Sequence, residues 1–271
     1  MTAPAPSPGT AEAPGLTVDA FLGGRVEALQ PASGHHRSGL EAVLLGASLD
    51  PRESGTVIDL GAGAGVAGFC AAARCPAASL VLIERDPLLV EASRRALARP
   101  ANAAFAARVR TVAADIADGD AIARETGVAV VLINPPFNRA GAMSRSPRPG
   151  RAAAHALDDG HLADWLDAAE RLLAARGRVT VIFRAEGLDE LLAGLGRSFG
   201  GLDVLAVHPR RTAPAHRVLV TAVKGSRAAP RILPPLVLHG DNGNAFLPEI
   251  DRLLRDGAGL QELVETWQER R

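Results

Sequence analysis

The sequence predicts an α/β domain in which a mostly parallel, seven-stranded sheet is covered by helices on both faces. Apolar strand-like runs alternate with helical runs along the middle of the chain, which is the pattern of βαβ units. A glycine-rich turn directly follows the first of these runs. The last two runs are joined by a loop without a helix, so the last strand is expected to run antiparallel. The strands are expected at residues 56–60, 79–83, 108–112, 128–133, 178–183, 202–207 and 217–223.

Helices are expected where apolar residues recur at helical spacing between these strands. Pro51 and Gly177 lie just beyond two of the expected helix ends, as breakers do. The connection 117–126 is a weak helical segment, and 138–150 is a loop rich in Arg, Pro, Gly and Ser. The expected helices span residues 40–49, 66–74, 88–99, 161–175, 188–195 and 247–255.

The chain is expected to divide into a core and flanking segments. Residues 1–15 are rich in Ala, Pro, Ser and Thr and predict a disordered tail, without the basic start and apolar centre of a secretory signal. Residues 16–55 form an N-terminal extension of short strands and a helix. Residues 56–225 form the core, and residues 226–271 form a C-terminal extension that packs on it.

Composition excludes several classes of protein. A chain of 271 residues suits one large α/β domain, and no run is apolar enough to cross a bilayer. The formal net charge is zero, so any contact with RNA must come from a local basic patch. The two cysteines, Cys70 and Cys75, form no metal-binding motif. We therefore expect a cytoplasmic protein in a reducing compartment, without structural metal.

The chain's chemistry is expected where the run Val128–Ile133 ends in Asn134-Pro135-Pro136-Phe137. In an open parallel sheet, ligands bind at the carboxyl ends of the strands. An exocyclic amine such as adenine N6 is a poor nucleophile because its lone pair is delocalised into the ring. Two acceptors, the Asn134 side-chain carbonyl and the Pro135 backbone carbonyl, would localise that lone pair. The prolines offer no competing N–H, and Phe137 can stack on a base.

The glycine turn has two interpretations. Gly63–Gly68 satisfies GxGxxG with Glu84 about twenty residues on, which is the dinucleotide fingerprint. Asp59 counts against it, because a carboxylate before the glycines would repel a pyrophosphate. S-adenosylmethionine carries a sulfonium and an ammonium, and both favour a nearby anion. The dinucleotide interpretation also leaves Asn134–Phe137 without a role.

The expected donor site is therefore built from the ends of three strands. The backbone of Gly61, Gly63 and Gly65 approaches the amino-acid moiety of S-adenosylmethionine closely. Glu84 is expected to accept hydrogen bonds from both ribose hydroxyls. Asp115 is expected to accept one from the adenine amine.

These residues together resemble class I S-adenosylmethionine-dependent methyltransferases. Residues 37–47 are similar to the segment before the first strand in bacterial tRNA(Val) adenine-N6 methyltransferases, which modify the adenine 3′ of the anticodon. The resemblance extends from about residue 16 to residue 260. It includes residues 153–155, Trp165, residues 217–220 and residues 238–243. It implies that Asn134, Pro135, Pro136 and Phe137 carry catalysis and that Arg37 and Ser38 lie near the donor's carboxylate.

The chain departs from that family at three places. Phe137 stands where Tyr is more frequent, so stacking is retained and a hydroxyl is lost. Glu41 stands where Asp is usual, and His35-His36 lengthens the preceding loop. Similar motifs occur in rRNA guanine-N2 methyltransferases and protein-glutamine methyltransferases, which stay open as alternatives. A non-catalytic RNA-binding or dinucleotide-binding module is the alternative outside enzymes.

Arginines near the motif and the last two strands are candidates for binding the substrate RNA. If they meet at the cleft rim, they bind phosphates on an otherwise neutral protein. The other interpretation is a solvated loop in an arginine-rich sequence. His155, His208 and His216 are expected to be structural or rim residues, and the oligomeric state is not indicated. The candidate arginines are Arg139, Arg145, Arg148, Arg210 and Arg211.

Overall fold

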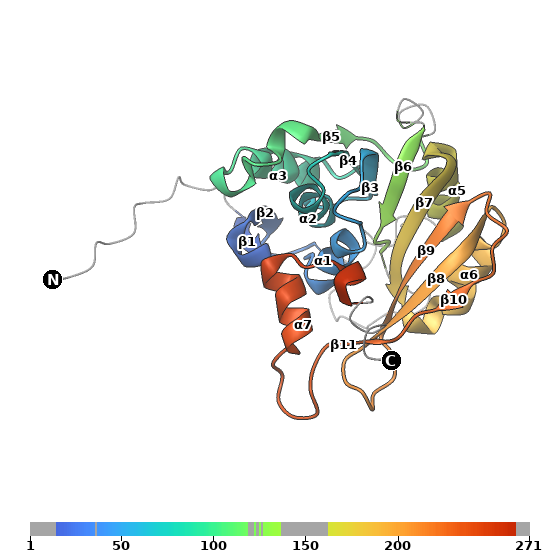
Figure 1. Ribbon diagram of the computed structural model, residues 1–271. Coiled ribbons are helices and arrows are strands. Elements are labelled where there is room, and N and C mark those ends of the chain that lie inside the picture. Colours follow the sequence, from blue (N-terminus) through green and yellow to red (C-terminus); the bar gives the residue numbers. More distant parts are fainter. Residues whose placement is uncertain are drawn as a thin grey trace, which may run out of the picture.

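The computed structural model describes residues 15–35, 37–118, 122, 125, 127–136 and 162–263. Within them, a large sheet lies between helices (Figure 1). The strand order is β10-β8-β9-β7-β6-β3-β4-β5, and β11 pairs with β8. The strands are β3 (Gly55–Leu60), β4 (Ala78–Glu84), β5 (Val109–Ala113), β6 (Val128–Ile133), β7 (Leu173–Arg184), β8 (Phe199–His208), β9 (Arg217–Lys224), β10 (Arg231–Ile232) and β11 (Leu236–Val237).

The predicted sheet is confirmed at its centre. Strands β5, β4, β3, β6 and β7 are parallel, and β9 runs antiparallel between β7 and β8. The short strands β10 and β11 add to the outer edge of β8, so this sheet has more strands than predicted. The N-terminal extension forms a separate antiparallel pair, β1 (Leu16–Phe21) and β2 (Val26–Pro31).

Helices cover both faces of the sheet because alternate residues of each strand point to opposite faces. Val57 packs into the cluster that contains α1, α2 and α3, while Ile58 packs into the cluster that contains α5 and α6. The C-terminal segment joins the first cluster through Ile250 and Leu253. The helices are α1 (Leu40–Ala47), α2 (Val66–Arg74), α3 (Pro87–Leu97), α5 (Leu162–Leu172), α6 (Leu188–Leu195) and α7 (Pro248–Asp251).

Three predicted helix ends lie too far along the chain, because α1 ends at Ala47, α3 at Leu97 and α5 at Leu172. Helix α5 ends at Leu172 because Leu173 already pairs with Val128 of β6. Lys224 donates to the carbonyls of Glu170 and Leu173 and so satisfies the end of the helix. The C-terminal helix ends at Asp251 and continues as a π-helical turn, Arg252–Asp256.

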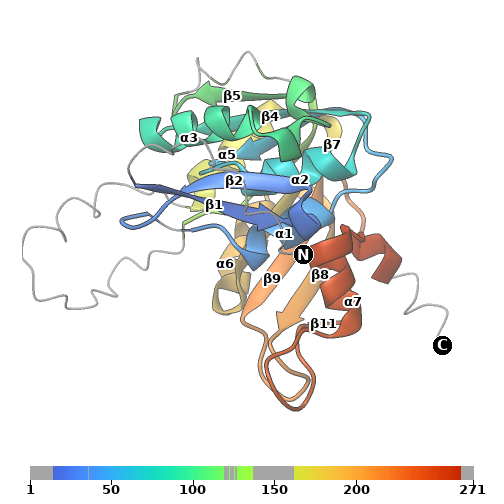
Figure 2. The same cartoon turned by 90° about the vertical axis from the view of Figure 1, so that its left-hand side faces the viewer.

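The carboxyl ends of β3, β4, β5 and β6 meet at one edge of the sheet, since the strands are parallel. Strand β9 is antiparallel to β7, and β8 is antiparallel to β9. Strand β8 therefore runs in the same direction as β7 and ends at the same edge. The connection 209–216 follows β8 at this edge, and the loop after β11 lies beside this connection (Figure 2). None of the described helices is long and apolar enough to cross a membrane.

Candidate active site

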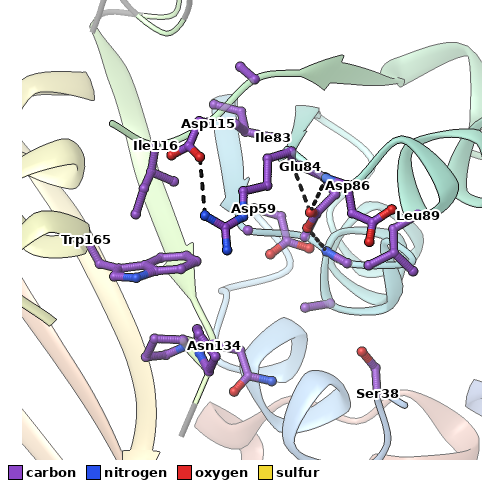
Figure 3. Close-up of a pocket in the computed structure, with 18 of the residues that line it drawn as sticks. Ser38, Asp59, Ile83, Glu84, Asp86, Leu89, Asp115, Ile116, Asn134 and Trp165 are labelled. Atoms are coloured by element: carbon purple, nitrogen blue, oxygen red, sulfur yellow. Dashed lines mark hydrogen bonds and ion pairs between the residues drawn. The ribbon is translucent and has the colours of Figure 1, made fainter. Parts of the chain in front are cut away.

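A pocket of about 540 Å³ opens at this edge of the sheet. Its lining comes from the ends of β3, β4, β5 and β6 and from the starts of α1, α2, α3 and α5. Figure 3 shows carboxylates gathered at one end of the pocket and Asn134 and Ser38 at the other. The volume lies in the range of small-molecule and cofactor sites. The pocket thus lies where the sequence predicts ligand binding.

The glycine turn brings backbone to the pocket wall. Gly61 and Gly63 line the pocket, and their φ angles are +68° and +57°. A Cβ on Gly63 would meet nothing within 4 Å, so this backbone is open to a ligand. A Cβ on Gly61 would lie 2.2 Å from the Trp165 ring. Gly65, at φ +87°, is not part of the lining and packs beneath the turn against Leu82 and Phe69.

Asp59 is buried in the pocket floor, with 2% of its surface exposed. Its Oδ2 accepts a hydrogen bond of 2.8 Å from the backbone N–H of Gly68 in α2. Burial raises the pKa of Asp59 to about 7; the Gly68 N–H opposes this shift, and the charge of Glu84 adds to it. A cation in the pocket would therefore favour the ionised form of this carboxylate.

Glu84 is held by three backbone N–H groups. Its Oε2 accepts from Gly63 at 2.8 Å, and its Oε1 accepts from Arg85 at 2.9 Å and from Asp86 at 2.8 Å (Figure 3). A carboxylate offers about four acceptor positions. One acceptor position, on Oε2, therefore remains for a ligand hydroxyl. The sequence predicts that Glu84 accepts from both ribose hydroxyls, and the structure leaves room for one.

Asp115 lies at the end of β5 and also lines the pocket. Its Oδ2 forms an ion pair of 3.3 Å with Arg85, and its Oδ1 accepts from the backbone N–H of Ala117 at 2.9 Å. The side chain is 40% exposed, so this carboxylate remains accessible to a ligand. The strand ends predicted for Asp59, Glu84 and Asp115 do meet at one cavity.

Asn134, Pro135 and Pro136 all line the pocket. The Oδ1 atom of Asn134 is buried and has no hydrogen-bond partner among the residues that the structure describes. A buried acceptor without a partner costs about 1–3 kcal/mol, so this carbonyl is suited to an N–H from a ligand. Pro135 is buried and Pro136 exposed. Phe137 lies outside the described residues.

The structure separates Arg37 from Ser38. Ser38 lines the pocket. The guanidinium of Arg37 points to the N-terminal strands, where it donates to Thr17 Oγ1 and the Pro31 carbonyl at 2.8 Å each and pairs with Asp19. The expectation that Arg37 lies at the donor's carboxylate is therefore replaced by a role in holding the loop before α1.

The structure adds apolar lining residues that the motifs did not indicate. Leu89 and Ile116 line the pocket beside the carboxylates, and Trp165 lines its α5 side (Figure 3). Trp165 belongs to the resemblance described above, and the other two residues have weak signals in the sequence. Ile116 directly follows Asp115, and Leu89 lies one helical turn after the N-cap residue Asp86. Flat apolar walls of this kind suit the two faces of a nucleobase.

The lining is strongly acidic. Five carboxylates face one arginine and one histidine: Asp59, Glu84, Asp86, Asp115 and Asp164 against Arg85 and His35. Acidic lining favours a cationic ligand. The open backbone at Gly63, the remaining acceptor on Glu84 and the anion at Asp59 fit S-adenosylmethionine. No group of three or more His, Cys, Asp or Glu in the described ranges could hold a metal ion.

The candidate RNA-binding arginines differ in their environment. Arg210 donates to the backbone carbonyls of Gly240 and Gly243 and to Asn244 Oδ1, so it ties the connection 209–216 to the loop after β11. Arg211 is exposed. Arg139, Arg145 and Arg148 lie outside the described residues.

The sheet order, the antiparallel β9 and the pocket beside the glycine turn define a class I S-adenosylmethionine-dependent methyltransferase fold. The chain belongs to the Methyltransferase small domain family, whose model matches residues 37–209. The resemblance inferred from the sequence is confirmed. The family match covers the whole pocket lining except His35.

Curated relatives with two different RNA substrates match this chain. A tRNA1(Val) (adenine(37)-N6)-methyltransferase of Shewanella amazonensis is 36% identical over 42% of this chain and 46% of its own length. A protein of the same name from Dickeya chrysanthemi is 30% identical, over 70% of this chain and 74% of its own length. A ribosomal RNA small subunit methyltransferase C of Stutzerimonas stutzeri is 36% identical, over 39% of this chain and 29% of its own length. The matched part thus spans less than half of the first and third relatives.

A solved structure from Agrobacterium tumefaciens, described as a predicted O-methyltransferase, matches with a TM-score of 0.68. It is 33% identical, and the match covers 80% of this chain and 96% of that protein. The match therefore extends over most of both chains.

Proposed function

We propose that this protein is an S-adenosylmethionine-dependent methyltransferase that modifies adenine N6 in tRNA. The proposed target is the adenine 3′ of the anticodon in a tRNA(Val)-like substrate. Relatives named for this reaction support it, the Dickeya protein over most of its own length. We infer a cytoplasmic enzyme, because tRNA is found there and both cysteines are free and buried.

The observation that carries the proposal is the buried Oδ1 of Asn134 in the pocket wall, which has no hydrogen-bond partner among the described residues. An adenine amine has two hydrogens and a lone pair delocalised into the ring. The Asn134 side-chain carbonyl accepts one hydrogen and the Pro135 backbone carbonyl accepts the other. The nitrogen becomes more tetrahedral, and its lone pair is localised toward the donor. A substrate that is methylated on a hydroxyl oxygen has a single hydrogen there. It would need only one of these two carbonyls.

The chain's own residues hold and orient the methyl donor. S-adenosylmethionine supplies an electrophilic methyl group on its sulfonium. The backbone at Gly61 and Gly63 admits the amino-acid portion, and the free position on Glu84 accepts from a ribose hydroxyl. Asp115 accepts from the donor's adenine, and Asp59 faces the cationic portion. Positioning of the two reactants in line supplies most of the rate.

RNA fits this site without a separate binding domain. A base in the anticodon loop is single-stranded, so it leaves the stack at little cost compared with a base in a duplex. The net charge of zero leaves RNA affinity to local arginines such as Arg211. The carboxyl edge of the sheet carries both the pocket and the connection that contains Arg211.

The second candidate function is methylation of ribosomal RNA, which the name of the Stutzerimonas relative supports. The sequence motif makes guanine N2 the expected target in that case. That reaction also needs two hydrogen-bond acceptors directed at a planar exocyclic amine.

The purified protein should be incubated with S-adenosylmethionine carrying a labelled methyl group, and with tRNA or rRNA in separate reactions. The nucleosides are then identified by mass spectrometry. Labelled N6-methyladenosine from tRNA is the expected product; labelled N2-methylguanosine from rRNA alone would replace this proposal with the second candidate.

The donor is tested separately by calorimetry. S-adenosylhomocysteine is expected to bind the protein, and NAD is expected not to bind. The reverse result would favour the dinucleotide interpretation of Gly63–Gly68.

A further inference from the structure

A buried glutamine outside the pocket holds one wall of it. Gln30 lies in β2 with 2% of its surface exposed. Its Oε1 accepts from the backbone N–H of Ser38 at 2.7 Å, and its Nε2 donates to the backbone carbonyl of Ser38 at 3.1 Å. One side-chain amide thus binds both backbone groups of a single residue, as a neighbouring strand would.

Two charged residues fix the orientation of this amide. The second hydrogen of Gln30 Nε2 goes to Asp19 Oδ2 at 2.6 Å. Asp19 in turn pairs with Arg37, which is also bound to Thr17 and to the Pro31 carbonyl. A flipped amide would place its oxygen against the Asp19 carboxylate and the Ser38 carbonyl. The three hydrogen bonds therefore specify one rotamer and one orientation.

The held residue faces the ligand. Ser38 lines the pocket, and its hydroxyl points into the cavity across from Asn134 (Figure 3). The loop before α1 has no place in the large sheet, so its position depends on side-chain contacts such as these. Among the described strands, β2, which carries Gln30, pairs with β1 alone. The two N-terminal strands thereby form a support for the pocket wall.

We propose that Gln30 is a positioning residue of the donor site, which acts by holding Ser38 at the pocket wall. Asp19 and Arg37 keep its amide in the orientation that this requires. The inference rests on the proposed function, because it takes the pocket to be the site of S-adenosylmethionine. It gives the N-terminal extension a role in donor binding through contacts that do not touch the donor.

The test compares the dissociation constant of S-adenosylhomocysteine across a set of variants of the full chain. Gln30→Met removes all three hydrogen bonds at similar volume. Gln30→Glu removes only the two donated bonds and places a second carboxylate beside Asp19. Each is expected to weaken binding roughly fivefold to tenfold, the scale of one or two hydrogen bonds. Melting temperatures confirm that each variant is folded.

Gln261→Met is the matched control. Gln261 also donates from Nε2 to a serine carbonyl, that of Ser48 at 2.8 Å, but at the other end of α1. It is not part of the pocket lining, and its replacement is expected to leave donor affinity unchanged. An equal loss in Gln261→Met and Gln30→Met would show a general loosening of α1 and would overturn the proposal.

A double-mutant cycle with Ser38→Ala separates positioning from a merely structural role. If Gln30 acts through Ser38, then Gln30→Met weakens binding less than twofold in the Ser38→Ala background. An undiminished fivefold loss in that background would overturn the proposal, as would unchanged affinity in both Gln30 variants. A wild-type protein that does not bind S-adenosylhomocysteine would instead contradict the proposed function and this inference with it.

Discussion

At the scale of single residues, Glu84 and Asn134 are prepared for ligands in opposite ways. Glu84 has three of its acceptor positions filled by backbone N–H groups, so its carboxylate is rigid before any ligand arrives. Asn134 Oδ1 is buried without a partner in the described part of the chain. The first arrangement fixes a binding group in place. The second arrangement leaves an acceptor free to bind the N–H of the reacting amine.

Donor affinity should depend on pH through Asp59. Burial raises the pKa of this carboxyl to about 7, so it is mostly protonated at pH 6 and mostly ionised at pH 8. A donor with an ammonium group binds the ionised form better. We expect S-adenosylhomocysteine to bind several-fold more tightly at pH 8 than at pH 6, measured by calorimetry. In Asp59→Asn this difference should shrink; an identical difference would assign the pH dependence to another group.

The free energy of unfolding should fall with rising pH, whereas donor affinity should rise. The pKa of Asp59 is about 7 in the folded protein and 3.8 as the ordinary value. Between these values the folded state keeps a proton that the unfolded chain has lost. The free energy of unfolding therefore falls as pH rises from about 4 to about 7, by up to a few kcal/mol. Urea unfolding of the ligand-free protein at pH 5 and pH 8 checks this, and Asp59→Asn should reduce the difference.

The residues of the site were predictable to different degrees. Asp59, Glu84, Asp115 and Asn134 follow strand ends, and parallel strands bring such ends together, so their meeting was predictable. The position of Arg37 was not, because its direction depends on Asp19 and Thr17 in a separate pair of strands. Trp165 contacts Gly61 across the sheet from a helix far along the chain. Periodicity carries no information on such a contact.

At the scale of elements, the glycine turn and the α1–α2 contact depend on glycine for different reasons. Gly63 has a positive φ and an open face to the pocket. Gly46 lies in α1, where a Cβ would be 2.8 Å from Cys70 Cβ and 3.0 Å from the Ala67 carbonyl oxygen of α2. Substitution by alanine should therefore affect binding at one position and packing at the other.

Gly63→Ala should lose both donor affinity and some stability. The positive φ costs about 1–2 kcal/mol for an alanine, and the new methyl group would occupy space that the donor needs. We expect the dissociation constant for S-adenosylhomocysteine to rise about tenfold or more. Unchanged affinity would mean that the backbone at Gly63 does not approach the donor.

Gly46→Ala should lose stability without losing donor affinity. The new methyl group meets backbone atoms of α2 that cannot move aside independently, and overpacking of this kind costs about 1–3 kcal/mol. Part of this is offset by the better helix propensity of alanine. Thermal unfolding should show a lower melting temperature, while donor affinity stays near that of the wild type. An increase in melting temperature would show that the two helices separate easily.

Element positions were predictable where the pattern is local. The helices 66–74 and 188–195 and the strand 128–133 have the bounds that their periodicity predicts. The end of α5 was not predictable, since it depends on strand pairing with Val128 and on Lys224 far along the chain. The short strands β10 and β11 pair with the edge of β8, and a pairing between separate segments has no signal in a local pattern.

At the scale of the whole molecule, a net charge of zero means that RNA affinity depends on where the arginines lie. The connection 209–216 follows β8, whose carboxyl end lies at the same edge of the sheet as the pocket. The loop after β11 lies beside this connection (Figure 2). Arg210 holds these two segments together through two backbone carbonyls and Asn244. Arg211 beside it is exposed and available to phosphates.

Arg211→Ala and Arg210→Ala should therefore differ. Arg211→Ala should weaken binding of a tRNA anticodon stem-loop and lower the slope of log affinity against log salt by about one. The melting temperature should not change. Arg210→Ala should lower the melting temperature, because carbonyls of the loop lose their donor. Equal melting temperatures and unchanged RNA affinity in both variants would place the RNA contact elsewhere, with the arginines of residues 139–148 as the next candidates.

Single-turnover methyl transfer by Asn134→Ala is the most direct measurement, with donor affinity measured on the same preparation. The side-chain carbonyl of Asn134 is proposed to act on the reacting amine and not on the donor. The rate of N6-methyladenosine formation in tRNA should fall about 100-fold or more, while the dissociation constant for S-adenosylhomocysteine stays within about twofold of the wild-type value. An unchanged rate, or a loss of rate explained by an equal loss of donor binding, would contradict that role.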